Sequence, residues 1–267
     1  MSRTAVLRST FIALLAILLG AGGGLLAHRM SSHTLQAAKI PLRILFIGNS
    51  YTYVNDLPVT VSQLASAGGH PIDTAMDAPG GWTLAQHVAS PDTLKLLRQE
   101  KWDYVGLQEQ SQIPASASAR SQGMYPAVRR LVAQIRGVGA KPLLFLTWGH
   151  RDGWPEAGLW GYAAMQSQLT AGYLEIANEL QIPVAPVGEA WRRAQAFSPP
   201  VGLWQGDGSH PTVQGTYLAS CVFYATIFRQ SPVGLSYGDG LVPSMTRTLQ
   251  SLAATTVLAD PRLWNLS

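Results

Sequence analysis

The feature that most constrains the fold is an alternation of strand-like and helix-like segments along most of the chain. Short runs rich in apolar and β-branched residues are expected to form strands, and they cover residues 43–47, 72–76, 104–107, 142–147 and 182–187. Segments with apolar residues at helical spacing lie around residues 57–65, 124–135, 162–180, 213–228 and 244–258. Strands that alternate with helices form a mainly parallel sheet covered on both faces, so we expect a three-layer α/β/α sandwich.

Polar or aromatic residues directly follow three of the expected strands. Ser50 comes after the first strand, Gln108 follows the strand at 104–107, and Trp148-Gly149-His150 follows the next. The carboxyl ends of parallel strands meet at one edge of a sheet, and ligands bind beyond that edge. The sequence therefore predicts that these residues lie along the rim of one site.

The segment GDGSHP at residues 206–211 adds a carboxylate and an imidazole to this picture. Asp207 and His210 are three residues apart, just before the expected helix at 213–228. A carboxylate at this spacing can accept the Nδ1–H of the imidazole, which leaves Nε2 free to act as a base. With Ser50, the pair predicts a Ser-His-Asp triad. A turn serine and a loop of helix-capping residues are the alternative interpretation.

Four ordered segments resemble the sequence blocks of the SGNH/GDSL hydrolases, a family of serine esterases and lipases that includes carbohydrate esterases. The segments are FIGNSYT at 46–52, PGGWT at 79–83, VGLQEQS at 105–111 and DGSHP at 207–211. The resemblance implies a flavodoxin-like sandwich in which Ser50 is the nucleophile, His210 the general base and Asp207 its partner. It also implies an oxyanion hole formed by the N–H groups of Ser50 and Gly81 and the side chain of Gln108.

Two positions depart from the family pattern. Asn49 stands where many members carry Asp, and this leaves the neighbouring serine in place. Gln108 stands where the family normally has an asparagine. Glutamine offers the same amide N–H₂ on a side chain that is one methylene longer. The type of donor is therefore the same, but it extends further from the backbone.

Aromatic residues near the expected rim bear on the substrate. The chain has 8 tryptophans, many for its length, and Trp82 and Trp148 fall near the rim together with His150. Flat indole rings can stack on sugar rings, which favours a carbohydrate ester over a long-chain lipid. We expect these three residues to contact the substrate; aromatic packing under long loops is the alternative for the tryptophans.

The first 38 residues differ from the rest of the chain. Arg3 and Arg8 precede an apolar run from Phe11 to Ala27, which is the pattern of an export signal. The run is glycine-rich and short for a membrane-spanning helix, so cleavage is favoured and an uncleaved N-terminal anchor is the alternative. Residues 39–267 are expected to form the catalytic domain, which would be periplasmic, secreted or membrane-anchored outside the cytoplasm.

Charge and cysteine content exclude other classes of function. Residues 1–38 hold Arg3, Arg8 and Arg29 and no acidic residue, so the rest of the chain is almost neutral and no nucleic-acid partner is expected. Cys221 is the only cysteine, so no intrachain disulfide can form. The histidines lack the spacing of a zinc site, and the expected chemistry needs neither metal nor cofactor.

The sequence therefore predicts an exported serine esterase that removes a short acyl group, such as acetyl, from a small-molecule or glycan ester through an acyl-enzyme. An O-acyltransferase of the same family would carry the same triad. A catalytically silent glycan-binding module that keeps the fold is a third interpretation. The intact set of Ser50, Asp207 and His210 argues against it.

Overall fold

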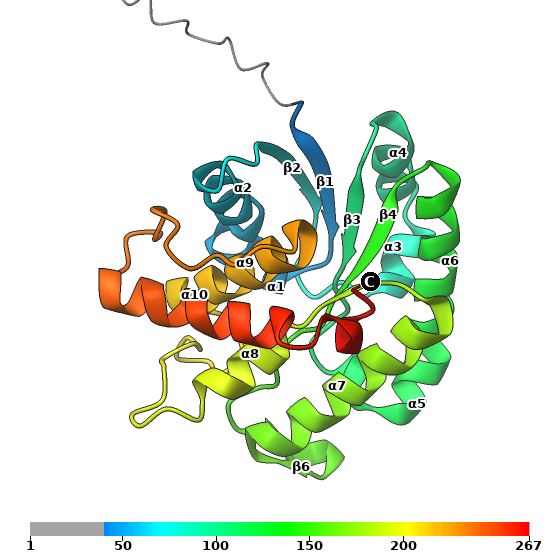
Figure 1. Cartoon of the computed structure of the whole chain (residues 1–267). Coiled ribbons are helices and arrows are strands. Elements are labelled where there is room, and N and C mark those ends of the chain that lie inside the picture. The colour runs from blue at the N-terminus through cyan, green and yellow to red at the C-terminus, as the bar shows by residue number, and fades with distance from the viewer. Residues whose placement is uncertain (1–39, 267) are drawn as a thin grey trace, which may run out of the picture. The chain divides into compact units, whose positions relative to one another are not determined.

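The computed structural model describes residues 40–266. They form a five-stranded parallel sheet with helices on both faces (Figure 1). The strands are β1 (Leu42–Ile47), β2 (Ile72–Asp77), β3 (Tyr104–Leu107), β4 (Lys141–Phe145) and β7 (Val184–Ala185), in the order β2-β1-β3-β4-β7. The three-layer α/β/α sandwich expected from the sequence is confirmed.

The predicted leader at residues 1–38 lies outside the described residues. Within residues 40–266, no helix has both the length and the apolar character needed to cross a membrane.

Strand β1 lies inside the sheet, between β2 and β3, and ends level with both. Residues 44–47 are fully buried, as expected for a parallel strand covered on both faces. Ile47 at the end of β1 pairs with Asp77 of β2 on one side and with Leu107 of β3 on the other. The strand order reverses at β1, and such a reversal opens a crevice beyond the strand ends, between β1 and β3.

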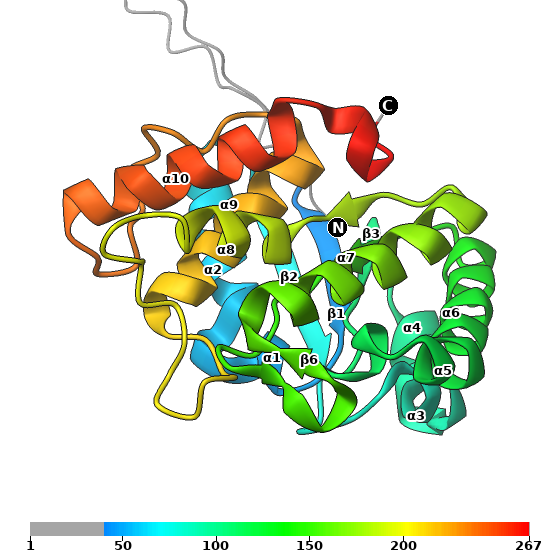
Figure 2. The ribbon, with the colours of Figure 1, turned by 90° about the horizontal axis from the view of Figure 1, so that it is seen from below.

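Two groups of helices cover the two faces of the sheet (Figure 2). One face carries α2 (Leu57–Ala67), α8 (Val187–Ala194), α9 (Val213–Phe228) and α10 (Pro243–Leu258), with α9 packed against the other three. The other carries α3 (Leu84–Ala89), α4 (Pro91–Gln99), α6 (Tyr125–Gly137) and α7 (Gly161–Leu180). Helix α9 is covered by α10, and most residues of α9 are therefore buried. This burial explains the almost continuous apolar sequence of α9.

Shorter elements complete the rim of the sheet. Helix α1 (Ser50–Tyr53) follows β1 directly, and α5 (Ala117–Ala119) lies in the connection after β3. A two-stranded antiparallel hairpin of β5 (Gly153–Trp154) and β6 (Leu159–Trp160) follows β4.

Candidate active site

The structure brings the three predicted triad residues together at the carboxyl edge of the sheet. Ser50 Oγ lies 2.9 Å from His210 Nε2. His210 Nδ1 lies 2.5 Å from Asp207 Oδ2. A serine hydroxyl, an imidazole and a carboxylate in this order can activate the serine as a nucleophile.

The loop that carries Asp207 and His210 is held by its own backbone. Asp207 Oδ1 accepts hydrogen bonds from the N–H groups of Ser209 at 2.9 Å and His210 at 3.0 Å. Gly208 takes a φ of +70°, a conformation that costs glycine little. The tight turn therefore points the second carboxylate oxygen at the imidazole.

These contacts also set the charge of Asp207. Burial by itself would raise the pKa of this carboxyl, but hydrogen bonds from the His210 side chain and from two backbone N–H groups outweigh it and lower the pKa to about 2. Asp207 is therefore ionised at neutral pH, where it can stabilise a protonated His210.

A cavity of about 380 Å³ opens beside the triad. Its lining includes Ser50, Gly81 and His210, and no aliphatic side chain lies among the described residues that line it. The backbone N–H groups of Ser50 and Gly81 have no acceptor within residues 40–266. They are therefore free to donate to a ligand.

Gln108 does not line this cavity, and its predicted role as an oxyanion donor is wrong. Its side chain is only 1% exposed. Its Oε1 accepts from the N–H of Asn49 at 2.8 Å and from the hydroxyl of Thr52 at 3.0 Å. Its Nε2 donates to Asn49 Oδ1 at 2.9 Å and to the carbonyl of Glu109 at 2.7 Å. Both amide hydrogens are thus used inside the protein, where Gln108 holds the turn that precedes Ser50.

Gln110 places a different amide in the cavity. Its Oε1 accepts from the N–H groups of Gln112 at 2.8 Å and Ile113 at 3.2 Å, which fixes the orientation of the amide. Its Nε2 makes one long contact, 3.4 Å, to Ser111 Oγ, and its second N–H has no partner among the described residues. The sequence signal was a second amide side chain, three residues beyond the end of β3.

Trp148 and Trp82 do not line the cavity, contrary to the expectation that they contact substrate. Trp148 is 1% exposed and is stacked between Tyr51, at a centroid distance of 4.4 Å, and Trp191, at 4.1 Å. Its Nε1 donates to the carbonyl of Ser209. The Trp82 ring packs against His87 at 5.1 Å. Trp148 therefore supports the loop that carries His210, and Trp82 packs beside His87.

His150 lies on the rim, as expected from its position after β4. Its Nε2 lies 3.1 Å from the hydroxyl of Ser111. Ser111 lines the cavity, so this histidine reaches the site through Ser111.

His87 supports the turn before Ser50 and is not among the site residues predicted from the sequence. It is fully buried, and its Nε2 donates to the carbonyl of Gly48 at 2.8 Å. Its Nδ1 lies 3.1 Å from the hydroxyl of Thr93, which donates to Asp77. This chain of contacts fixes the turn between β1 and Ser50.

Glu109 joins the two loops that border the cavity. Its carboxylate is fully buried, and Oε1 accepts from the N–H groups of Leu84 at 3.1 Å and Gln110 at 2.7 Å. Oε2 has no hydrogen-bond partner among the described residues. Burial raises the pKa of Glu109 to about 7, although the two backbone N–H groups oppose the rise.

The raised pKa of Glu109 predicts a pH-dependent stability. The folded protein keeps a proton that the unfolded chain releases, so the contribution of Glu109 to stability is greatest below pH 4.5 and is lost as the pH rises toward about 7. We expect Glu109→Gln to remove on the order of 3 kcal/mol of this pH dependence. Denaturant unfolding of both proteins between about pH 4.5 and 8 measures the difference.

Glu156→Gln is the matched control, because Glu156 is exposed and has no ion pair among the described residues. It should leave the pH dependence of unfolding as it is in the wild type. A Glu109→Gln variant whose stability follows the wild-type pH profile would show that folding does not raise the pKa of Glu109.

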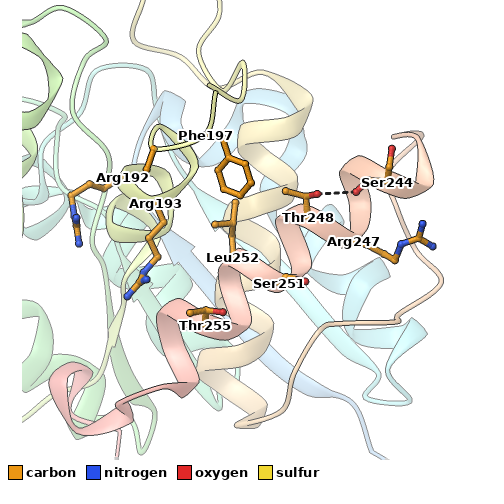
Figure 3. Close-up of a pocket in the computed structure, with 10 residues that line it drawn as sticks. Arg192, Arg193, Phe197, Ser244, Arg247, Thr248, Ser251, Leu252 and Thr255 are labelled. Atoms are coloured by element: carbon orange, nitrogen blue, oxygen red, sulfur yellow. Dashed lines mark hydrogen bonds between the residues drawn. The ribbon is translucent and has the colours of Figure 1, made fainter. Parts of the chain in front are cut away.

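A larger cavity of about 800 Å³ lies between α8 and α10 (Figure 3). Arg193 and Arg247 lie on its two sides, with Phe197 and Leu252 between them. None of its lining residues is a histidine, cysteine or carboxylate, so it offers hydroxyl groups but no general base. The smaller cavity at Ser50 is therefore the candidate active site.

No group of three or more His, Cys, Asp or Glu side chains within residues 40–266 is arranged to hold a metal ion. The side chains at the cavity instead supply a nucleophile, a base and hydrogen-bond donors.

Comparison with known proteins gives matches among solved structures. No family model matches the chain, and no curated protein matches it by sequence. A DUF4886 family protein from Bacteroides uniformis is 20% identical with a TM-score of 0.70, over 83% of this chain and 96% of its own. A candidate SGNH hydrolase from Slackia heliotrinireducens is 26% identical with a TM-score of 0.60, over 70% of this chain and 100% of its own.

A variant of an acetyl-xylooligosaccharide esterase from Geobacillus Stearmophilus shares the fold at lower identity. It is 17% identical with a TM-score of 0.54, over 70% of this chain and 94% of its own. The match covers most of each chain, so the same sandwich underlies both.

Proposed function

Because this chain belongs to the SGNH/GDSL hydrolases, we propose that it is an exported serine esterase that removes short acyl groups from hydroxylated substrates such as glycans. One observation carries the proposed chemistry: the hydrogen-bonded line from Asp207 through His210 to Ser50. The leader sequence alone supports export.

The proposed reaction has two steps. His210 Nε2 accepts the proton of Ser50 as Oγ attacks the acyl carbonyl, and the carboxylate of Asp207 stabilises the resulting imidazolium. His210 then gives the proton to the leaving alcohol. In the second step His210 takes a proton from water as the water attacks the acyl-enzyme. The bond between the acyl carbon and Ser50 Oγ then breaks, His210 returns the proton to Oγ, and the acid is released.

The negative oxygen of each tetrahedral intermediate needs hydrogen-bond donors. The free N–H groups of Ser50 and Gly81 and the side-chain amide of Gln110 are the donors that we assign to it. All three residues line the same cavity, and the bonds from Gln112 and Ile113 hold the Gln110 amide in one orientation. A donor held in place before the reaction costs little reorganisation during it.

The lining of the cavity favours a short acyl group. A long acyl chain gains its binding energy from apolar contact, about 0.8 kcal/mol for each buried CH₂, and this cavity offers glycine, serine, tyrosine and amide groups instead. One structural neighbour is an acetyl-xylooligosaccharide esterase, so acetylated xylooligosaccharides are the first natural-type substrates to test.

The acyl-length preference gives a direct test. For 4-nitrophenyl esters we expect kcat/KM to fall by about tenfold or more, a barrier increase of about 1.4 kcal/mol, between acetate and octanoate. Initial rates across the series measure it, with Ser50→Ala protein as the blank for non-enzymatic hydrolysis. A preference for octanoate would contradict the short-acyl assignment.

Product analysis separates hydrolysis from acyl transfer. With an acetylated xylooligosaccharide and an excess of unacetylated xylan, an esterase releases free acetate. Acetylated xylan as the main product would identify an O-acyltransferase. Glycan binding without any turnover would identify a silent binding module.

A further inference from the structure

A second serine-histidine pair lies at the same cavity and has no part in the reaction described above. Ser111 Oγ lies 3.1 Å from His150 Nε2. Ser111 comes from the loop after β3, and His150 from the loop after β4. Ser111 lines the cavity together with Ser50 and His210.

Two further hydroxyl groups line the cavity near the catalytic base. Tyr51 OH lies 2.7 Å from Ser209 Oγ, and Ser209 directly precedes His210. Tyr51 and Ser111 line the same cavity as Ser209 and His210. Ser209, Tyr51 and Ser111 therefore form a polar wall in the cavity that His210 lines.

This wall faces the alcohol part of the ester. The leaving alcohol must come close to His210 Nε2, because that nitrogen supplies its proton. The oxyanion is assigned to the N–H groups of Ser50 and Gly81 and to the Gln110 amide, which lies beside Ser111 at 3.4 Å. Any group of the alcohol that extends beyond His210 meets the hydroxyls of Tyr51 and Ser111.

The pair is suited to a neutral partner that both donates and accepts hydrogen bonds. Burial lowers the pKa of His150, and this is reinforced by His210 and opposed by Asp207, so the imidazole is neutral at neutral pH. A neutral imidazole has one donor and one acceptor, and a serine hydroxyl has one donor and two acceptor lone pairs. The bond between the two side chains uses one donor and one acceptor, so the pair keeps one donor and acceptor capacity for a ligand. A sugar hydroxyl has the same two capacities.

We propose that Ser111 and His150 form a subsite that hydrogen-bonds a free hydroxyl of the alcohol part of the substrate. This inference rests on the proposed esterase function and adds that the preferred alcohol is a sugar or polyol with a hydroxyl near the esterified oxygen. His150 is not expected to activate Ser111 as a second nucleophile, because no carboxylate bonds to its Nδ1 among the described residues.

The test compares two acetates whose alcohols have rings of similar size. Methyl xyloside monoacetate carries free hydroxyls, and cyclohexyl acetate carries none. We expect Ser111→Ala and His150→Phe to lower the ratio of kcat/KM for the xyloside to kcat/KM for cyclohexyl acetate by about three- to tenfold, the value of one hydrogen bond. The loss should appear mainly as a higher KM for the xyloside.

Two further variants sharpen the result. His150→Gln keeps a donor and an acceptor and should recover part of the ratio. Ser66→Ala removes an exposed serine of α2 and should leave the ratio at the wild-type value.

A merely structural role for the pair predicts a different result for the ratio of kcat/KM values. If Ser111 and His150 only tether two loops, both acetates lose activity together and the ratio stays constant, which would overturn the subsite. An unchanged ratio with unchanged activity would overturn it as well. Failure of the proposed function is distinct, because the wild-type protein would then hydrolyse neither acetate.

Discussion

Replacement of Ser50 by alanine should abolish ester hydrolysis and leave the protein as stable as the wild type. Among the groups that line the cavity, only the Ser50 hydroxyl lies at hydrogen-bonding distance from a histidine that is itself bonded to an ionised carboxylate, that of Asp207. Loss of a triad member typically lowers kcat by roughly 10⁴-fold or more. The hydroxyl makes one hydrogen bond, at the edge of an open cavity, so its removal should hardly change the melting temperature.

Ser66→Ala is the matched control, because Ser66 is an exposed serine on α2, away from the cavity. Its kcat and melting temperature should equal those of the wild type. Activity of Ser50→Ala within about tenfold of wild type, a barrier change of only about 1.4 kcal/mol, would contradict the role of Ser50.

Gln110→Ala should lower kcat by roughly a hundred- to a thousandfold with little change in KM. This is the usual cost of removing one oxyanion donor, and the pattern belongs to an interaction that is made in the transition state. Gln110 lies in a surface loop and is partly exposed, so the folded state should lose little stability. Steady-state kinetics and a thermal melt on the same preparation measure both effects.

Gln108→Ala is the contrasting variant, since it removes the same side chain two residues earlier. Here the buried N–H of Asn49 and the hydroxyl of Thr52 lose their acceptor. A buried polar group left without a partner costs about 1–3 kcal/mol, so we expect a clear loss of stability. A stable Gln108→Ala variant with a kcat a hundredfold or more below wild type, beside a fully active Gln110→Ala, would reverse the assignment.

Much of the sheet could be predicted from the sequence, because buried parallel strands are short apolar runs between helices. The run at residues 104–107 became β3 without change. The run at 182–187 was overestimated, and only Val184 and Ala185 pair with β4. Pro183 and Pro186 flank them, and proline has no N–H to donate to a neighbouring strand.

The triad could be predicted from the sequence because its geometry is largely local. Asp207 and His210 lie on one turn, and Ser50 follows a central strand. The amide donor to the oxyanion could not be predicted from the sequence. Whether Gln108 or Gln110 enters the cavity depends on Asn49, whose backbone and side chain bind Gln108 from 59 residues away.

The tryptophans illustrate the same limit. A position after a strand suggested that Trp148 contacts substrate, but Tyr51 and Trp191 pack on its two faces. Both partners are distant in the sequence, and no local pattern indicates that they stack on this ring.

The role of Ser50 as the nucleophile is tested most directly by covalent labelling with a fluorophosphonate, followed by mass spectrometry of the peptides. The serine oxygen would attack phosphorus and displace fluoride, which leaves a stable phosphonyl ester on the residue that reacts. We expect a single adduct on Ser50, none in Ser50→Ala, and much slower labelling in His210→Ala because the base is missing. An active enzyme that is labelled on Ser111 or Ser209 instead, or that is not labelled at all, would contradict the assignment.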